Sequence, residues 1–179
     1  MKKTILFALS LLTVVCLLSG CSKQESTDTS GETTSSSESS EKETAAFPSD
    51  EEILEEMSPY LEKTQKQEIE AAGSLEDFLL NNLGLEADGI TDAVLYLGMP
   101  NQNTTYFLML TLEDSADREN INQKVEEQLK AWQKTAEMGY VSGYTEYKII
   151  EKQDKLFAVM HEKQDSFEKM CEYLEDLKD

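Results

Sequence analysis

The chain has 179 residues, a length that suits one ordinary domain beside shorter segments. Its 36 acidic residues outnumber its 16 lysines and arginines, so the formal net charge is −20 at pH 7. This charge argues against nucleic-acid binding and against electrostatic attachment to anionic lipid, because both need clustered Lys and Arg. We therefore expect no nucleic-acid partner.

The start of the chain has the pattern of a bacterial lipoprotein leader. Lys2 and Lys3 precede an apolar run, residues 5–18, that has the length of a signal-peptide core and is shorter than a membrane-spanning helix. The segment Leu18-Ser19-Gly20-Cys21 then matches the lipobox, in which the cysteine receives diacylglycerol and becomes the mature N-terminus. We expect a signal peptide over residues 1–20, cleavage between Gly20 and Cys21, and lipidation of Cys21. The alternative is an uncleaved membrane anchor with a chance cysteine.

Residues 21–47 are expected to form the lipidated cysteine and a disordered tether. From residue 22 to residue 46 the chain has no Ile, Leu, Val, Met or aromatic residue and is rich in Ser, Thr and Glu. Such a segment buries too little apolar surface to offset the entropy of ordering it. Residues 48–179 are then a single globular domain, held outside the cell by a lipid in the outer leaflet of the cell membrane.

The three cysteines predict a domain without disulfides. Cys16 leaves with the leader, Cys21 carries the lipid, and Cys171 remains alone. No intrachain disulfide can then form, and the spacing of the cysteines matches no zinc motif. We expect no metal and no cofactor.

The domain is predicted to begin with two or three helices. Ser49 and Glu52 have the spacing of a capping box, and Pro59 is expected to stop the helix that they open. A second helix is expected over residues 59–72. A third is expected to start at Ser74 and to end at Gly84, with one apolar face made of Leu75, Phe78, Leu79 and Leu83.

Two hairpin–helix units are expected after these helices. Residues 93–98 and 105–112 have strand composition, and so do residues 146–150 and 156–161, with turn residues between the members of each pair. Asp114 or Ser115 is expected to cap the helix after the first hairpin, whose apolar stripe contains Ile121, Val125, Leu129, Trp132 and Ala136. Asp165 with Glu168 is expected to cap the last helix, whose apolar face is Phe167, Met170, Cys171, Leu174 and Leu177.

This order predicts an α+β fold. The N-terminal helices would be followed by two hairpin–helix units that form a four-stranded, mainly antiparallel sheet. The two later helices would pack on one face of that sheet. Residues 105–112 have apolar side chains at both alternating sets of positions, so we expect the N-terminal helices to cover part of the second face.

The lipobox, the Ser/Thr/Glu tether and several later segments together resemble a known family. These segments are Leu75-Glu76-Asp77-Phe78, Leu83-Gly84-Leu85, the helix through Trp132-Gln133, and the loop over residues 140–147. The pattern is similar to the small lipoproteins of Gram-positive gut bacteria grouped as domain of unknown function 4358. The resemblance implies the same location and fold over roughly residues 50–177. It implies no activity, because no catalytic residues are established for that family.

The loop after the long helix is the candidate binding surface. Its Tyr140, Tyr144 and Tyr147 supply rigid amphipathic contact area, and Gly139 and Gly143 permit unusual backbone angles. The alternative is a plain connection that packs Tyr144 and Tyr147 onto the sheet, and the sequence favours this alternative.

For the other candidate residues, a structural role is favoured over a catalytic or metal-binding one. His161, the only histidine, is expected to be a polar residue at a strand end. Cys171 lies on the apolar face of the last helix and is expected to act as a small buried hydrophobe. Glu86, Asp88 and Asp92 surround a glycine, but their spacing departs from a calcium loop and favours a solvated turn.

The sequence contains no catalytic constellation, so the leading hypothesis is a non-enzymatic binding module. Its partner would be an envelope protein, a peptide or a wall component. Two alternatives remain open. One is a carrier that holds a small apolar or cationic ligand between the sheet and the N-terminal helices. The other, less favoured, is a wall hydrolase that uses a pair of carboxylates, one with a raised pKa.

Overall fold

A computed structural model describes residues 46–99, 102–140 and 142–178. The expected signal peptide, the cleavage site at Gly20, the lipidated Cys21 and nearly all of the expected tether lie outside these residues. Within the described part, no helix combines the length and the apolar character needed to cross a membrane.

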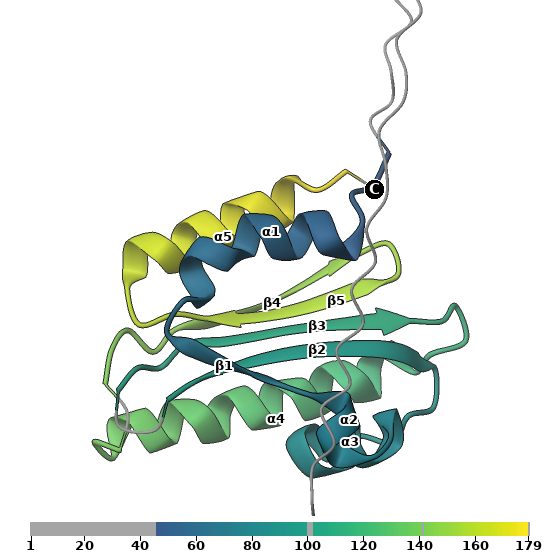
Figure 1. Ribbon diagram of the computed structural model, residues 1–179, viewed down its shortest axis with the longest axis horizontal. Helices are drawn as coiled ribbons and strands as arrows, with labels where there is room; N and C mark the ends of the chain where they lie inside the picture. Colours follow the sequence, from purple (N-terminus) through teal and green to yellow (C-terminus); the bar gives the residue numbers. More distant parts are fainter. Residues whose placement is uncertain (1–45, 100–101, 141, 179) are drawn as a thin grey trace, which may run out of the picture. The chain divides into compact units, whose positions relative to one another are not determined.

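The centre of the domain is an antiparallel sheet of five strands in the order β1-β2-β3-β5-β4 (Figure 1). The strands are β1 Thr64–Gln67, β2 Ile90–Gly98, β3 Tyr106–Leu112, β4 Tyr147–Lys152 and β5 Lys155–Met160. The α+β class and the two hairpins of the sequence analysis are confirmed. The expected number of strands is corrected from four to five.

The additional strand is β1, which lies in the segment expected to be a helix over residues 59–72. It pairs with β2, with Thr64 opposite Gly98 and Gln67 opposite Leu95. Its sequence, Thr-Gln-Lys-Gln, has no apolar alternation; β1 lies at a sheet edge, where two of its side chains are exposed and two are half-buried. Of the expected second helix, residues 59–61 belong to the end of α1, and the short helix α2, Ile69–Ala72, forms near its other end.

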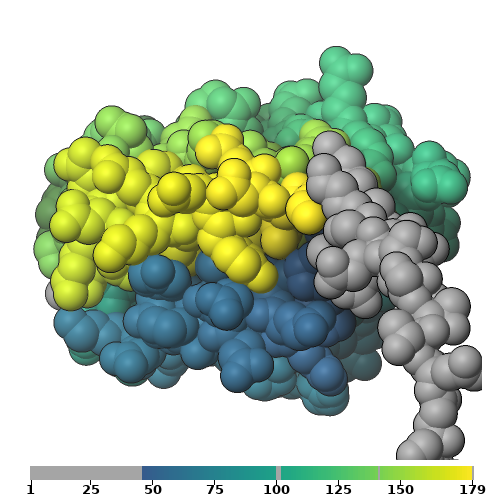
Figure 2. Space-filling view, turned by 90° about the horizontal axis from the view of Figure 1, so that it is seen from above, coloured from purple at the N-terminus to yellow at the C-terminus, as the bar shows by residue number. Residues whose placement is uncertain are grey.

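Helices cover both faces of the sheet. On one face lie α1, Asp50–Leu61, and α5, Gln164–Asp176, side by side (Figures 1 and 2). On the other lie α2, α3, Leu75–Leu83, and α4, Arg118–Glu137. The expectation that the two later helices share one face is therefore wrong.

The central strands explain why both faces need a cover. In β3, Phe107 and Met109 belong to the hydrophobic cluster under α1 and α5, whereas Leu108 and Leu110 belong to the cluster under α3 and α4. Strand β5 alternates in the same way and is buried along its whole length. Each face must therefore be shielded from water, and one helix of each hairpin–helix unit covers one face.

The helix starts agree in part with the sequence signals. The capping box of Ser49 and Glu52 is confirmed, with the Ser49 amide donating to the Glu52 carboxylate at 2.8 Å. Ser74 caps α3, as expected, by accepting from the Asp77 amide at 3.1 Å. Pro59, however, does not stop α1. It lies in the last turn, where it removes one N–H group, and the burial of Leu61 favours continuation of the helix to that residue.

The caps expected for the two later helices are wrong. A turn in which the Ala116 amide donates to Glu113 delays the start of α4, and Asp117 is its N-cap. Helix α5 begins at Gln164 without a side-chain cap. The His161 ring accepts from the Lys163 amide at 3.0 Å and so fixes the chain just before that helix, ahead of the expected cap at Asp165.

Candidate binding groove

A groove of about 250 Å³ lies between α3 and α4, above β2 and β3. Its lining combines apolar side chains, side-chain amides and hydroxyls, and contains no charged residue. The lining residues are Asn81, Asn82, Leu95, Leu97, Tyr106, Gln128, Ala131, Trp132 and Thr135.

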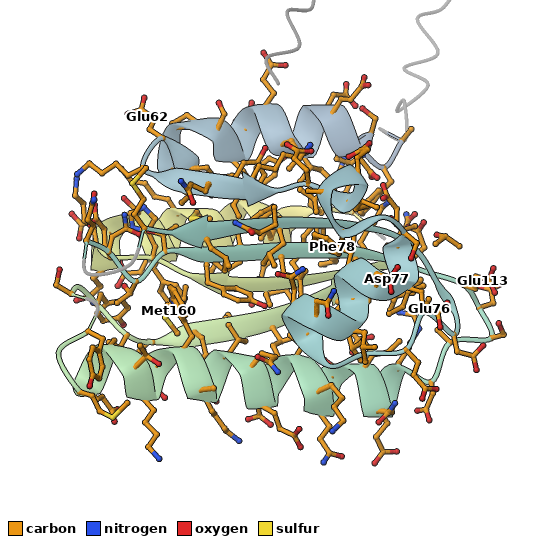
Figure 3. The ribbon with its side chains drawn as sticks, turned by 60° about the horizontal axis from the view of Figure 1, so that its bottom comes forward. Glu62, Glu76, Asp77, Phe78, Glu113 and Met160 are labelled. Carbon is orange, nitrogen blue, oxygen red and sulfur yellow. The ribbon has the colours of Figure 1, made fainter. Side chains whose placement is uncertain are left out.

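One wall comes from α3. Phe78 points toward the sheet and is buried, while Glu76 and Asp77 point outward (Figure 3). The helix ends at Gly84, which adopts the left-handed conformation (φ 64°) and donates to the Leu80 carbonyl oxygen at 3.1 Å. Asn82 donates to the Phe78 carbonyl oxygen at 2.9 Å, so its own amide oxygen remains available as an acceptor.

The other wall comes from α4, which buries Ile121, Val125 and Leu129 against the sheet. Trp132 lies one turn beyond Leu129. It packs against the same hydrophobic cluster, and its indole Nε1 donates to the Thr104 carbonyl oxygen at 2.9 Å. This hydrogen bond fixes the ring in place at the groove. Trp132, expected in the apolar stripe of this helix, is partly buried and also lines the groove.

The floor consists of Leu95 and Leu97 from β2 and Tyr106 from β3, with Leu97 and Tyr106 directly opposite each other in the pair. Tyr106 is 4% exposed, and its hydroxyl has no hydrogen-bond partner within the described part of the chain. Burial raises the pKa of Tyr106, so the hydroxyl stays protonated and is a hydrogen-bond donor. A buried hydroxyl without a partner is unfavourable by about 1–3 kcal/mol.

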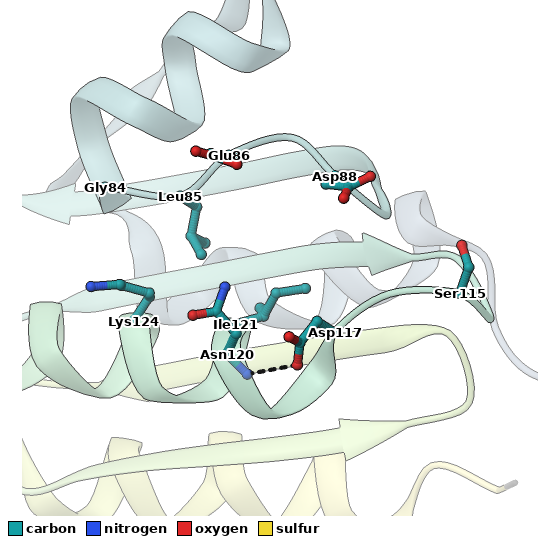
Figure 4. A pocket seen from close by; sticks show the side chains of 9 residues that line it. All are labelled: Gly84, Leu85, Glu86, Asp88, Ser115, Asp117, Asn120, Ile121 and Lys124. Atoms are coloured by element: carbon teal, nitrogen blue, oxygen red, sulfur yellow. Dashed lines mark hydrogen bonds between the residues drawn. The ribbon is translucent and has the colours of Figure 1, made fainter.

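A larger cavity of about 390 Å³ lies at the start of α4 (Figure 4). Its lining includes Glu86, Asp88, Asp117 and Lys124, and Asp117 is already engaged with the Asn120 amide at 3.1 Å. Asp92, the third member of the acidic candidate, lines a different hollow. Among the residues that the structure describes, no group of three or more His, Cys, Asp or Glu side chains has the geometry to hold a metal ion.

The three tyrosines of the predicted binding loop lie in different environments. Tyr140 is 59% exposed beyond the end of α4. The Tyr144 ring packs against Phe167 of α5, at a centroid distance of 5.5 Å. Tyr147 packs against the cluster on the opposite face and donates to Glu126 of α4 at 3.3 Å. The structure does not bring these tyrosines together into one surface.

His161 connects three segments rather than facing a nucleophile. Its Nδ1 lies 3.0 Å from the Lys163 amide nitrogen and 3.3 Å from the Lys163 carbonyl oxygen, and its Nε2 lies 3.2 Å from the Tyr60 carbonyl oxygen. A proton assigned to Nε2 lets that atom donate to Tyr60 while Nδ1 accepts from the Lys163 amide. Burial lowers the pKa of His161. Cys171 is buried in the cluster under α1 and α5, where burial raises the pKa of its thiol to about 11.

The carboxyl groups with shifted pKa values do not resemble a catalytic pair. The pKa of Glu52 is lowered by hydrogen bonds from Ser49, that of Glu126 by Lys130, and that of Glu127 by Lys124. A general acid needs the opposite shift. None of these three carboxylates lines the groove.

Tyr106 and the amides Asn81, Asn82 and Gln128 were not among the residues expected from the sequence to form a site. Tyr106 is one member of an apolar alternation in β3, and nothing in the sequence separates it from Leu108 or Leu110. The amides lie on polar helix faces. Only the packing of α3 beside α4 brings them to one place.

The chain matches no protein-family model, no curated protein and no solved structure. The resemblance given in the sequence analysis therefore stays an expectation.

Proposed function

We propose that this chain is a lipid-anchored protein of the outer face of the cell membrane whose domain binds a small ligand without chemical conversion. The ligand site is the groove between α3 and α4. Among the hypotheses from the sequence, this proposal is nearest to the carrier of a small apolar or cationic ligand between the sheet and the N-terminal helices, but here α4 forms the second wall. The supporting observation is a hollow with an aromatic wall, converging amides and one buried donor without a partner.

The size of the groove limits the ligand. Pockets for drug-sized molecules have volumes of roughly 300–1,000 Å³. A groove of about 250 Å³ therefore accommodates a single ring or one side chain of a larger molecule.

The chemistry of the lining supports binding rather than catalysis. The groove contains no Ser, Cys, His or carboxylate side chain. Its two hydroxyl groups belong to Tyr106, which is held protonated by burial, and Thr135, which donates to the Ala131 carbonyl oxygen at 2.9 Å. Neither has a neighbouring base within the lining to activate it as a nucleophile.

The lipid anchor is tested separately from the groove. Replacement of Cys21 by Ala is expected to release the protein from the membrane and to abolish incorporation of labelled palmitate. Retention of the variant at the membrane with the fatty acid still attached would contradict the anchor.

The binding function is tested by native mass spectrometry of the full-length protein, purified in a detergent without a sugar head group. We expect a small molecule to co-purify or to be taken up from a neutral envelope extract. The variant Ala131→Phe places a ring in the groove and should prevent uptake. Lys134→Phe, on the same helix outside the groove lining, is the matched control and should bind normally. Equal uptake by the Ala131→Phe and Lys134→Phe variants would contradict the assignment of the ligand site to this groove.

A further inference from the structure

We propose that the ligand of the groove is a neutral sugar ring of an extracellular glycan. This inference rests on the proposed function and specifies the chemical class of its ligand.

The charge distribution indicates a neutral ligand. Acidic residues dominate the chain, and three other hollows in the described part each contain several charged side chains. The groove between α3 and α4 contains none. A charged ligand would lose part of its hydration there without gaining an opposite charge, which is unfavourable.

The mixture of surfaces indicates a sugar rather than an acyl chain. A pyranose ring has an apolar C–H face and hydroxyl groups around its edge. Trp132 and Leu97 offer apolar surface, while Asn81, Asn82 and Gln128 approach from two helices. A side-chain amide both donates and accepts, as a sugar hydroxyl does, so the two groups can satisfy each other in both roles. An acyl chain would cover the same amides and leave them unpaired.

Tyr106 supplies the deepest polar contact. Its hydroxyl is a donor without a partner at the floor of the groove, and an oxygen of the sugar would be its acceptor. The hydroxyl is enclosed, so a side chain at the rim must turn aside for this contact to form. Gln128 has a flexible side chain with no hydrogen bond within the described residues, which leaves it free to turn.

Trp132 is the only tryptophan of the chain and reports on the groove directly. The full-length protein, in a detergent without a sugar head group, is titrated with glucose, N-acetylglucosamine and their linked tetramers while tryptophan fluorescence is recorded. Saturable changes are expected with the neutral sugars. Glucuronate, which adds a charge, and cyclohexanol, which keeps the ring but has one hydroxyl, should each bind about tenfold more weakly or worse.

The variant Tyr106→Phe removes only the hydroxyl and should weaken sugar binding by about tenfold, with an unchanged circular dichroism spectrum. Tyr140→Phe removes the hydroxyl of an exposed tyrosine outside the groove lining and should bind as the wild type does.

Sugar binding that is unaffected by Tyr106→Phe and by Ala131→Phe would overturn the assignment. Saturable binding of cyclohexanol without binding of any sugar would overturn the ligand class and leave the binding function standing. Failure of all probes, together with no uptake from the neutral envelope extract, would overturn both proposals.

Discussion

Lys155 of β5 and Asp50 in the first turn of α1 form an ion pair, with the lysine Nζ 2.7 Å from the Asp50 Oδ1. The same Nζ donates to the Thr111 Oγ1 at 2.7 Å. The lysine side chain is only 8% exposed, whereas the Asp50 side chain is 36% exposed. This contact attaches the start of α1 to two central strands of the sheet.

Replacement of Lys155 by Met is expected to lower the free energy of unfolding by about 1–2 kcal/mol. The loss is moderate because Asp50 is exposed enough to be rehydrated once its partner is gone. Lys124→Met is the control, since Lys124 pairs with Glu127 at 3.1 Å and both side chains are exposed. Chemical denaturation should show that Lys124→Met lowers the free energy of unfolding by less than about 0.5 kcal/mol. Equal losses in the two variants would show that the Lys155 pair has no special role.

Tyr106→Phe is expected to raise the free energy of unfolding of the ligand-free protein by about 1 kcal/mol, because it removes a buried hydroxyl without a partner. Tyr147→Phe is the matched comparison, since it removes a hydrogen bond to Glu126. The free energy of unfolding of Tyr147→Phe should be lower than that of the wild type by about 0.5 kcal/mol. Thermal and chemical denaturation of both variants measure these changes. A clear loss of stability in Tyr106→Phe would mean that its hydroxyl already has a partner.

The stability of the protein should depend on the protonation of His161. Burial lowers its pKa below the ordinary value of 6.5 in the folded chain, so the unfolded chain binds the proton more readily. The stabilisation is therefore complete above about pH 6.5 and is lost as the pH falls through the lower pKa of the folded state. The backbone hydrogen bonds with Lys163 and Tyr60 and the charge of Glu162 oppose this lowering of the pKa, whereas the charge of Lys163 adds to it.

The contribution of His161 is isolated by comparison with the variant His161→Asn, because the acidic residues titrate in both proteins. The difference in unfolding free energy between wild type and variant should shrink on acidification from pH 7 toward pH 5. Urea denaturation at a series of pH values measures it. A difference that stays constant or grows on acidification would contradict the burial of a neutral imidazole.

Cys171 should resist alkylation in the folded protein. It is buried, and the raised pKa of about 11 leaves little thiolate at neutral pH. Iodoacetamide labelling followed by mass spectrometry of the peptide that contains Cys171 should show modification only after denaturation. Rapid labelling of the native protein at pH 7.5 would be inconsistent with this packing.

Much of the secondary structure could be predicted from the sequence because its signals are local. The capping residues Ser49 and Ser74, and the glycine after α3, each act within a few neighbouring residues. Strand β1 could not be predicted, since its residues are polar and its pairing with β2 is the only reason for its conformation. The distribution of α4 and α5 over two faces depends on how β5 enters between β3 and β4, which is a long-range relationship.

Most of the candidate site could not be predicted from the sequence, because it too depends on contacts between residues far apart in the chain. Tyr106 becomes distinctive only when Leu97 lies opposite it and α3 and α4 pack above it. The tyrosines at 140, 144 and 147 are close in sequence, yet the backbone sends Tyr144 and Tyr147 to opposite faces of the sheet. Proximity in sequence did not predict proximity in space at this loop.

The most direct test of the groove is nuclear magnetic resonance of the ¹⁵N-labelled protein during titration with the N-acetylglucosamine tetramer. The side-chain amide signals of Asn81, Asn82 and Gln128 should shift together and saturate, while that of Asn120, in the larger acidic cavity, should stay in place. Shifts centred on Asn120, or no saturable shift at the three groove amides, would contradict the account.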